Sequence, residues 1–466
     1  MTTVDPATVP SLAHGADPIA RVVTGAADCG GSVAAQDRPP AGETGGSAWR
    51  DRPIGRLVRG TLGLTAGRGV ASLVSAAWLV IAARRLPLSD FGDLALLLAV
   101  GGVFMAISDP GLQFVLAEHV ARSGRIHLTV VHRVLARRLV AGLVCAAASG
   151  VLYLAAAHRV DPVIPLIFTA SILCTAVYGS MLTAYRALGQ VTYDAMNEIG
   201  SRLLVIGLGS WWLFHGGGLR AAVITYAAAD AISAIVVYAV IRRSLVADRP
   251  STVPVDLRLR STAPLAFVTV TTIVYYKIDT YLVALLKGAA AAGLYGAAYR
   301  ILEGALIPAT TVASLMIAHT AGLGPETIVG TARRYVAVAV LFTVPVAAGG
   351  ALASHLILGG LFGTTFDRAT ACAAVLLLSA IPSAAVAAYA PVAGLRNRAG
   401  FAFGAVIALV INASANLLVI PRFGLVGAAW VNVGSQGFLA CWLARTVTTS
   451  ARRTLRGTLE PKEAVT

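Results

Sequence analysis

Long apolar segments recur along most of the chain and are separated by short polar connections. Segments of roughly 17–25 apolar residues match the hydrocarbon thickness that a transmembrane helix must cross. The pattern therefore predicts an all-α membrane protein with about twelve transmembrane helices. The predicted segments are 61–83, 92–117, 135–157, 163–185, 196–215, 220–241, 263–286, 290–318, 335–357, 370–391, 401–420 and 425–444.

Polar stretches divide the chain into two halves. Residues 1–55 are rich in Ala, Gly, Pro and Asp and are predicted to form a disordered cytoplasmic tail. The polar, proline-bearing stretch 244–262 is predicted to be a cytoplasmic linker between two six-helix lobes, 56–243 and 263–447, and 448–466 to be a basic tail. Three short matches between the halves, at nearly one spacing, are typical of the internal repeats in two-lobed transporters. We therefore expect two pseudo-symmetric lobes around a central cavity.

Composition supports a membrane protein and excludes several other classes. Hydrophobic residues make up 57% of the chain and charged residues 13%, against about 25% charged residues in soluble domains. The net charge of +15 lies between apolar segments rather than on one soluble face, so we expect no nucleic-acid partner. The five cysteines show no paired spacing, so neither a metal site nor a cofactor is expected. The chain has no GxxxxGKS/T, HExxH or GxSxG motif, and we expect no enzyme.

Basic residues are unequally distributed between alternate connections. Connections on the side of the two tails are rich in arginine, for example Arg133, Arg186 and Arg334. Connections on the other side hold fewer basic residues, for example Arg159 and Arg368. The positive-inside rule therefore predicts a multi-pass protein of the cell membrane with both termini in the cytoplasm.

Four charged residues fall inside the seventh and eighth segments: Lys277, Asp279, Arg300 and Glu303. Lys277 and Arg300 each lie about eleven residues from the turn near Gly288, which places both about 17 Å deep. A charge at mid-membrane costs about 3 to 10 kcal/mol or more, so these side chains must face protein or a wet cavity. Lys277 and Asp279 project to different faces of a helix. We therefore predict that Asp279 pairs with Arg300 and that Lys277 faces a cavity.

Other charged residues inside the segments have simpler interpretations. Arg68 and Asp109 lie near the cytoplasmic end of the first hairpin, where a pair could also serve only to lock helices in register. Glu198 and Arg202 are four residues apart and are interpreted as a structural pair. Asp230 in the sixth segment stands alone and is also interpreted as structural.

Three stretches, taken in order, resemble a known family. The stretch "ARRLPLSDFGDLALLLAVGGVFMAISDPGL" (83–112) resembles the first hairpin of polysaccharide-exporting flippases of the multidrug/oligosaccharidyl-lipid/polysaccharide superfamily, without the usual glycine before the proline. The stretch "KIDTYLVALLKGAAAAGLYGAAYRI" (277–301) is similar to the family's seventh and eighth spans. The stretch "NLLVIPRFGLVGAAW" (416–430) resembles a turn near the family's C-terminus.

The resemblance implies a two-lobed flippase for polysaccharide biosynthesis. It would move a polyprenyl-pyrophosphate-linked sugar across the cytoplasmic membrane by alternating access. Its partners would be this lipid-linked glycan, membrane lipids and glycan polymerases or glycosyltransferases of the same pathway. Basic side chains would bind the anionic pyrophosphate, and tyrosine rings would stack on the sugar. The candidate substrate-binding residues are Lys277, Arg300, Arg68, Tyr276, Tyr281 and Tyr299, and the candidate ion-coupling residues or structural ion pairs are Asp279, Glu303 and Asp109.

Two other functions stay open from the sequence. A drug or metabolite antiporter of the same superfamily would favour an acidic cavity for organic cations, whereas the residues above are mainly basic. A non-transporting membrane scaffold of a glycan-assembly complex would have all its charges paired and no cavity leading across the membrane.

Overall fold

The computed structural model describes residues 53–459 apart from 110, 158–160, 191, 245–258 and 321–324, and the described residues contain no strand. The first half comprises α2 (Pro53–Arg85), α3 (Leu88–Ile107), α4 (Leu112–Ser123), α5 (Leu128–Ala156), α6 (Val163–Ala187), α7 (Thr192–Phe214) and α8 (Leu219–Ser244). The second half comprises α9 (Leu259–Lys287), α10 (Ala289–Ala305), α11 (Ile307–Thr320), α12 (Pro325–Leu352), α13 (Ser354–Ile357), η1 (Leu358–Phe362), η2 (Thr364–Ala369), α14 (Thr370–Arg396) and α15 (Arg398–Leu459). Residues 1–52 of the predicted disordered tail and most of the predicted linker lie outside the described residues, while 53–55 belong to α2.

Nearly all described residues of the predicted apolar segments fall in these helices. Three segments are divided: 92–117 between α3 and α4, 290–318 between α10 and α11, and 335–357 between α12 and α13. The last two segments form α15, which bends at Gly424, where φ is 59° and ψ is −141°. Glycine adopts a positive φ of this kind most readily, because it has no Cβ atom. Seven helices in the described part of the chain are long and apolar enough to span a membrane, judged by length and composition.

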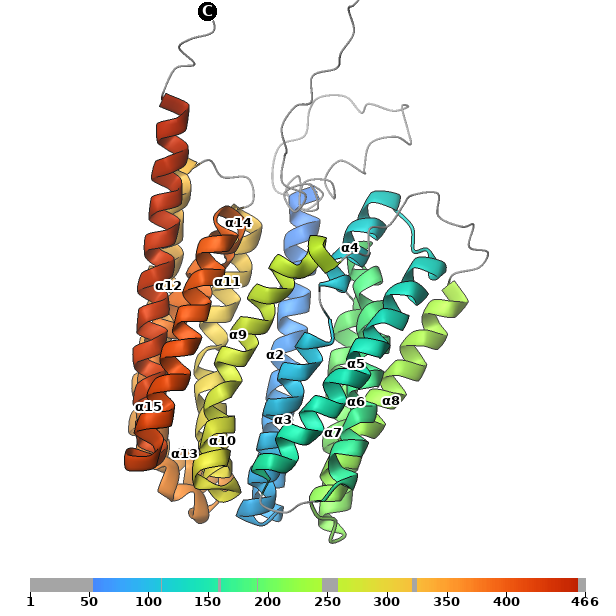
Figure 1. Ribbon diagram of the computed structural model, residues 1–466, viewed down its shortest axis with the longest axis vertical. Helices are drawn as coiled ribbons and strands as arrows, with labels where there is room; N and C mark the ends of the chain where they lie inside the picture. The colour runs from blue at the N-terminus through green and yellow to red at the C-terminus, as the bar shows by residue number, and fades with distance from the viewer. Residues whose placement is uncertain are drawn as a thin grey trace, which may run out of the picture.

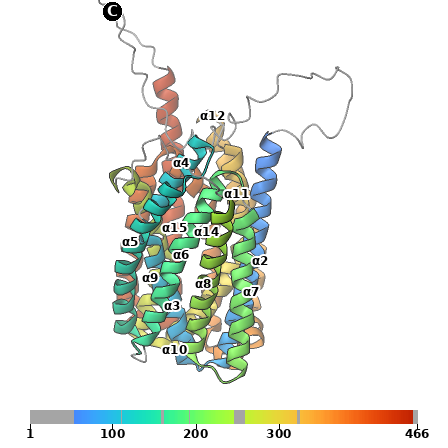
Figure 2. The ribbon, with the colours of Figure 1, turned by 90° about the vertical axis from the view of Figure 1, so that its right-hand side faces the viewer.

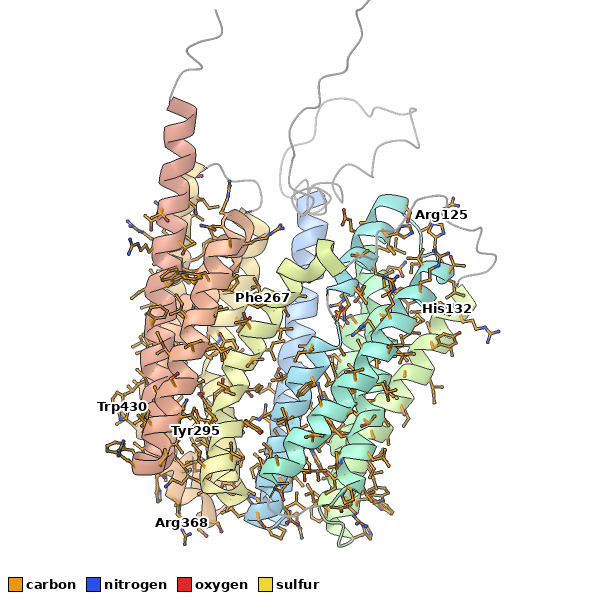
Figure 3. All side chains as sticks on the ribbon, viewed as in Figure 1. Arg125, His132, Phe267, Tyr295, Arg368 and Trp430 are labelled. Carbon is orange, nitrogen blue, oxygen red and sulfur yellow. The ribbon has the colours of Figure 1, made fainter. Side chains whose placement is uncertain are left out.

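The helices form two lobes, as the sequence predicted. Figure 1 shows α2–α8, the N lobe, beside α9–α15, the C lobe. The helices run along the long axis in both views (Figures 1 and 2). The helix α2 begins and α15 ends at the same end of the molecule, which we term the terminal end. Figure 3 places Arg125 near the terminal end and Arg368 at the opposite end.

The outer surface of the bundle is apolar. Val144, Leu166 and Leu341 are each about two-thirds exposed, and Trp430 points away from the C lobe in Figure 3. Soluble monomers rarely expose large contiguous apolar surfaces. In a bilayer the same side chains contact lipid tails, while each helix satisfies its own backbone hydrogen bonds. The prediction of an all-α, multi-pass membrane protein is therefore confirmed.

The two lobes contact each other closely at the end opposite the termini. Gly92 of α3 faces the start of α10, where an added methyl group would lie 1.7 Å from the carbonyl oxygen of Ala289. On the neighbouring helix α2, Arg84 donates from Nε to the carbonyl oxygen of Leu361 in η1 at 2.6 Å. The backbone of α3 therefore contacts the backbone of α10 across the lobe boundary, and this close approach requires a glycine at position 92.

We predict that Gly92→Ala prevents the lobes from closing at the end opposite the termini. The added methyl group overlaps a carbonyl group that cannot move like a flexible side chain, and overpacking of this kind typically costs about 1–3 kcal/mol. Distances between spin labels on Ser89 and Arg368 should lengthen and broaden. Gly102→Ala on the same helix is the control, because nothing lies within 4 Å of its added methyl group. Identical distance distributions for both variants would contradict the prediction.

Candidate functional site

The hairpin of α9 and α10 brings three charged side chains together at the lobe boundary. Glu303 Oε1 lies 3.3 Å from Lys277 Nζ, and Glu303 Oε2 lies 2.5 Å from Arg300 Nη1. Their side chains remain partly exposed, at 28% for Lys277, 32% for Arg300 and 36% for Glu303. Lys277 Nζ also lies 5.5 Å from the ring centre of Tyr299, within range of a cation–π interaction. One carboxylate thus serves two cations. We term Lys277, Arg300 and Glu303 the charged triad.

A small cavity adjoins the charged triad between the lobes. Its volume is about 40 Å³, and its walls come from α2 and α3 of the N lobe and from α9 and α10 of the C lobe. The lining residues are Leu79, Phe91, Ala95, Leu98, Ala99, Lys277, Thr280, Gly296, Tyr299, Arg300 and Glu303. One water molecule needs about 10–15 Å³ of such cavity volume, so this space holds only a few waters and is too small for a sugar or a pyrophosphate. A larger ligand therefore requires that the two walls move apart.

The predicted pairing of Asp279 with Arg300 is wrong. Asp279 is 1% exposed and lies inside the C lobe. Its carboxylate accepts hydrogen bonds from the side chains of Tyr295 (3.1 Å), Asn416 (2.9 Å) and Asn432 (2.9 Å). Arg300 instead contacts Glu303, because residues three positions apart share one face of a helix.

The amide groups around Asp279 were missed by the sequence analysis. Asn416 also donates to Asn412 Oδ1 at 3.0 Å, and Asn412 and Tyr275 both donate to Ser435 Oγ. We term the set the C-lobe polar cluster: Asp279, Tyr275, Tyr295, Asn412, Asn416, Asn432 and Ser435. The available signal was the presence of amides in the last two apolar segments, with Asn412 and Asn416 one helical turn apart.

The C-lobe polar cluster has the chemistry of a site for a hard cation. Within the described part of the chain, no basic side chain contacts Asp279, and Asn416 Oδ1 and Asn432 Oδ1 accept no hydrogen bond. A buried carboxylate and buried amide oxygens are costly when they lack a partner. Oxygen atoms of these two kinds are also the ligands that hard cations prefer.

The remaining candidate residues do not join the charged triad. The ring of Tyr276 packs against that of Tyr275 at a centroid distance of 5.5 Å, and Tyr281 packs against the hydrophobic core. Arg68 belongs to α2, but its side chain lies outside the described residues. Of the predicted substrate-binding residues, the structure therefore brings together Lys277, Arg300 and Tyr299.

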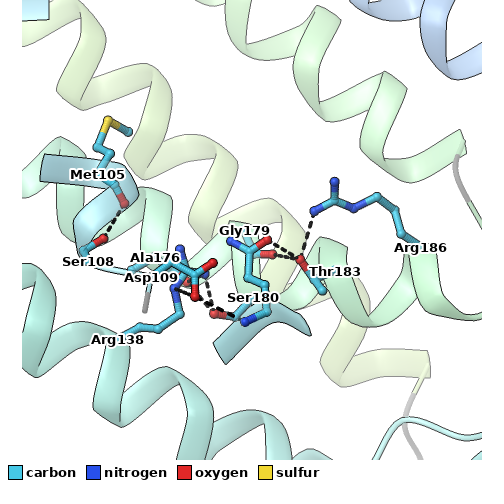
Figure 4. Close-up of polar contacts among 10 residues, drawn as sticks. Met105, Ser108, Asp109, Arg138, Ala176, Gly179, Ser180, Thr183 and Arg186 are labelled. Carbon is cyan, nitrogen blue, oxygen red and sulfur yellow. Dashed lines mark hydrogen bonds and ion pairs between the residues drawn. The ribbon is translucent and has the colours of Figure 1, made fainter. Parts of the chain in front are cut away.

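Asp109 belongs to a separate cluster inside the N lobe. Figure 4 shows Arg138 between Asp109 and Ser180. Arg138 is 3% exposed, its Nε lies 3.9 Å from Asp109 Oδ1, and its Nη1 donates to Ser180 Oγ at 2.8 Å. The backbone N–H of Gln113 donates to the same Asp109 oxygen at 3.2 Å. This ion pair links α5 and α6 to the break between α3 and α4, so its geometry is that of a structural pair.

We predict that Arg138→Met destabilises the protein by about 3–5 kcal/mol, because it leaves the Asp109 carboxylate without its cation. The double variant Arg138→Met/Asp109→Asn should lose clearly less stability, because it removes both charges together. Unfolding in detergent micelles, followed by helical circular dichroism, measures both losses. If the double variant is as unstable as the single variant, the loss of stability does not come from a buried Asp109 carboxylate that lacks its cation.

One protein family matches the sequence, and solved structures share the fold. A family described as "Polysaccharide biosynthesis protein" matches residues 57–318, more than half of the chain. No curated protein matches the chain. A multidrug resistance MATE family transporter of the MOP superfamily, in an inward-facing conformation, superposes with a TM-score of 0.63 at 15% identity over 84% of this chain and 96% of its own. Lipid II flippase MurJ, in an inward closed conformation, gives 0.62 at 13% identity over 86% and 93%.

A third solved structure also shares the fold. It is a MOP superfamily transporter from Pyrococcus furiosus, with a TM-score of 0.55 at 14% identity over 90% of this chain and 100% of its own. Reverse polarity of its binding pocket is described as suggesting a different function for that protein. At such low sequence identities the superpositions establish a shared fold alone. The family model, which matches more than half of the chain, establishes the family. The chain is therefore a member of the polysaccharide biosynthesis protein family with the fold of MOP superfamily transporters.

Proposed function

We propose that the protein is a flippase that moves polyprenyl-pyrophosphate-linked sugars from the cytoplasmic to the outer leaflet. The charged triad carries this proposal, because Lys277 and Arg300 share the single carboxylate of Glu303. A pyrophosphate bears more negative charge than that carboxylate and offers more oxygen acceptors. It therefore competes for both cations, and the planar guanidinium of Arg300 suits phosphate oxygens. Membership of the family supports a sugar-linked substrate.

Transport by alternating access is consistent with the contacts between the lobes. The cavity beside the charged triad must widen before it admits a headgroup. Release at the end opposite the termini requires that the approach of Gly92 to Ala289 and the hydrogen bond from Arg84 to Leu361 both break. The richer supply of arginines in the connections on the side of the tails favours an orientation with the terminal end in the cytoplasm.

The two alternative functions fit the charged triad less well. An antiporter for organic cations requires an acidic pocket, whereas the triad has two cations and one carboxylate. A scaffold protein would also pair its charges, and Glu303 does contact both cations. The partial exposure of the three side chains, from 28% to 36%, nevertheless favours a site that exchanges partners over a sealed structural pair.

The C-lobe polar cluster is the proposed site of a coupling cation. Asp279 supplies one negative charge, and the Oδ1 atoms of Asn416 and Asn432 supply unpaired oxygens. A single carboxylate among amides suits a monovalent ion such as Na⁺ better than a divalent ion, whose charge it leaves largely uncompensated. The proposed partners are glycosyltransferases that make the substrate and glycan polymerases that consume it.

We predict that Lys277→Ala and Arg300→Ala each lower translocation at least about tenfold, because each removes a charged hydrogen-bond donor to the pyrophosphate. Proteoliposomes carrying a fluorescent polyprenyl-pyrophosphate sugar measure the rate. Lys287→Ala is the control. Lys287 ends α9 at the turn before α10, and its Nζ donates to the carbonyl oxygen of Pro421 in α15. Wild-type rates in both triad variants, with correct folding and insertion, would refute the proposed site.

We also predict that Na⁺ raises the melting temperature and the transport rate of the wild type relative to choline, and that Asp279→Asn abolishes both responses. The substitution keeps the size of the side chain but removes the charge that an ion requires. Asp161→Asn, on an exposed connection where Asp161 bonds Arg220, should keep both responses. Sodium dependence retained by Asp279→Asn, or absent from the wild type, would leave the cluster a structural core only.

A further inference from the structure

A large apolar groove lies in the N lobe, and all of its described lining residues belong to α6, α7 and α8. Figure 2 shows α7 and α8 running side by side. The groove has a volume of about 560 Å³, within the range of roughly 300–1,000 Å³ that is usual for ligand-binding pockets. Two residues of its rim, Met196 of α7 and Val236 of α8, are 66% and 53% exposed. The groove therefore opens on the surface that contacts lipid.

The groove extends through about half of the membrane, at the terminal end. Its walls are the last turns of α6, the first turns of α7 and the last turns of α8. On α7 the lining residues run from Tyr193 to Leu204, eleven positions apart. At about 1.5 Å per residue this is roughly 17 Å, close to half of a hydrocarbon core of about 30 Å. The groove thus matches the depth of a single leaflet.

The inner end of the groove is polar. Ile232 is the deepest lining residue of α8, and Asp230 lies two positions further into the membrane. The Asp230 carboxylate accepts hydrogen bonds from Ser171 Oγ and, at 3.2 Å, from Tyr178 OH. Hydrocarbon that displaced these donors would leave a buried carboxylate without partners, which is costly. An apolar chain in the groove therefore ends near this level.

The space inside the groove exists because its inner wall carries small residues. A methyl group added at Gly200 would have nothing within 4 Å, so the groove is open at this point. Ser201 satisfies its hydroxyl within its own helix by donating to the carbonyl oxygen of Glu198 at 3.1 Å. None of the described lining side chains is charged. Ordered water needs two to four polar partners, so hydrocarbon suits these walls better than water does.

The mouth of the groove, at the terminal end, is basic and aromatic. The last turns of α6 and α8 carry three arginines: Arg186, Arg242 and Arg243. One acidic residue, Asp194, lies 3.8 Å from Arg186 and leaves an excess of positive charge. The rings of Tyr185 and Tyr193, which both line the groove, pack edge-on at a centroid distance of 5.0 Å. Tyrosines and basic residues are typical of the headgroup level, and basic clusters attract anionic lipids.

We propose that this groove binds an anionic phospholipid of the leaflet at the terminal end. One acyl chain fills the space beside Gly200, and the phosphate lies among the arginines at the mouth. The depth of one leaflet fits an acyl chain, whereas a polyprenyl tail is much longer than the groove. The site lies apart from the charged triad and does not rest on the proposed function.

The test uses photoreactive lipids in nanodiscs that contain the full-length protein. A phosphatidylglycerol and a phosphatidylcholine carry the same acyl chains, with a diazirine near the end of one chain, and a third probe is a photoreactive polyprenyl pyrophosphate. Mass spectrometry of peptides locates and quantifies the labels. Phosphatidylglycerol should label residues 193–204 and 232–241, at least about fivefold more than phosphatidylcholine does, because the two lipids differ in headgroup charge.

Two matched pairs of variants test the two parts of the site. Gly200→Leu fills the groove and should lower labelling of these peptides at least about tenfold. Gly207→Leu is its control, because Gly207 lies on the same helix outside the groove and an added methyl group there also has nothing within 4 Å.

Arg242→Gln/Arg243→Gln should remove most of the preference for phosphatidylglycerol. Its control is Arg333→Gln/Arg334→Gln, which removes two exposed arginines of α12 in the C lobe. If Gly200→Leu does not fold, Ser233→Leu replaces it, because Ser233 lines the same space from α8.

Three results would overturn the proposal. Equal labelling of Gly200→Leu and Gly207→Leu would show that no chain occupies the groove. Stronger labelling by the polyprenyl probe than by phosphatidylglycerol would identify a prenyl tail as the occupant. Equal labelling by phosphatidylglycerol and phosphatidylcholine would exclude recognition of an anionic headgroup. Lys277→Ala should label as the wild type does, whether or not it translocates substrate, so the result is independent of the proposed function.

Discussion

Hydrocarbon does not tolerate an unpaired charge, and this constraint determines which way the central helices face. Lys277, Arg300 and Glu303 are predicted to lie near mid-membrane, where a lone charge would be strongly unfavourable. They therefore turn toward the lobe boundary and share one carboxylate. Arg138 and Asp109 obey the same constraint inside the N lobe, where their side chains are 3% and 16% exposed. This lower exposure distinguishes the structural pair from the charged triad, for which we propose an exchange of partners.

The sharing of Glu303 also explains how the proposed anion site can be stable without its ligand. Two cations that share one small cavity would repel each other if no carboxylate lay between them. Glu303 offsets part of that repulsion while leaving an excess of positive charge. A bound pyrophosphate would replace the contacts of Lys277 and Arg300 with Glu303 by contacts with its own oxygens. The two cations would then have an anionic partner both with and without the ligand.

The sequence predicted which charged residues share a level of the α9–α10 hairpin, but not which way their side chains project. Counting about 1.5 Å per residue from the turn put Lys277 and Arg300 at one level, and both contact Glu303 there. The partners of Asp279 were not predictable, because Asn416 and Asn432 lie far along the chain and only packing of α15 on α9 brings them close. The same applies to Arg138, whose contact with Asp109 depends on the break between α3 and α4.

The short spacing between Lys277 and Asp279 connects the two proposed sites mechanically. Both residues belong to α9, and they project to nearly opposite faces, one to the lobe boundary and the other into the C-lobe polar cluster. A helix moves as a rigid element, so a cation that shifts α9 from one side alters the position of Lys277 on the other. Linkage requires the reverse effect with the same free energy, so a bound anion must change the affinity for the cation. The pair at positions 277 and 279 thus supplies a direct physical route for coupling, because no chain of intervening residues separates the two sites.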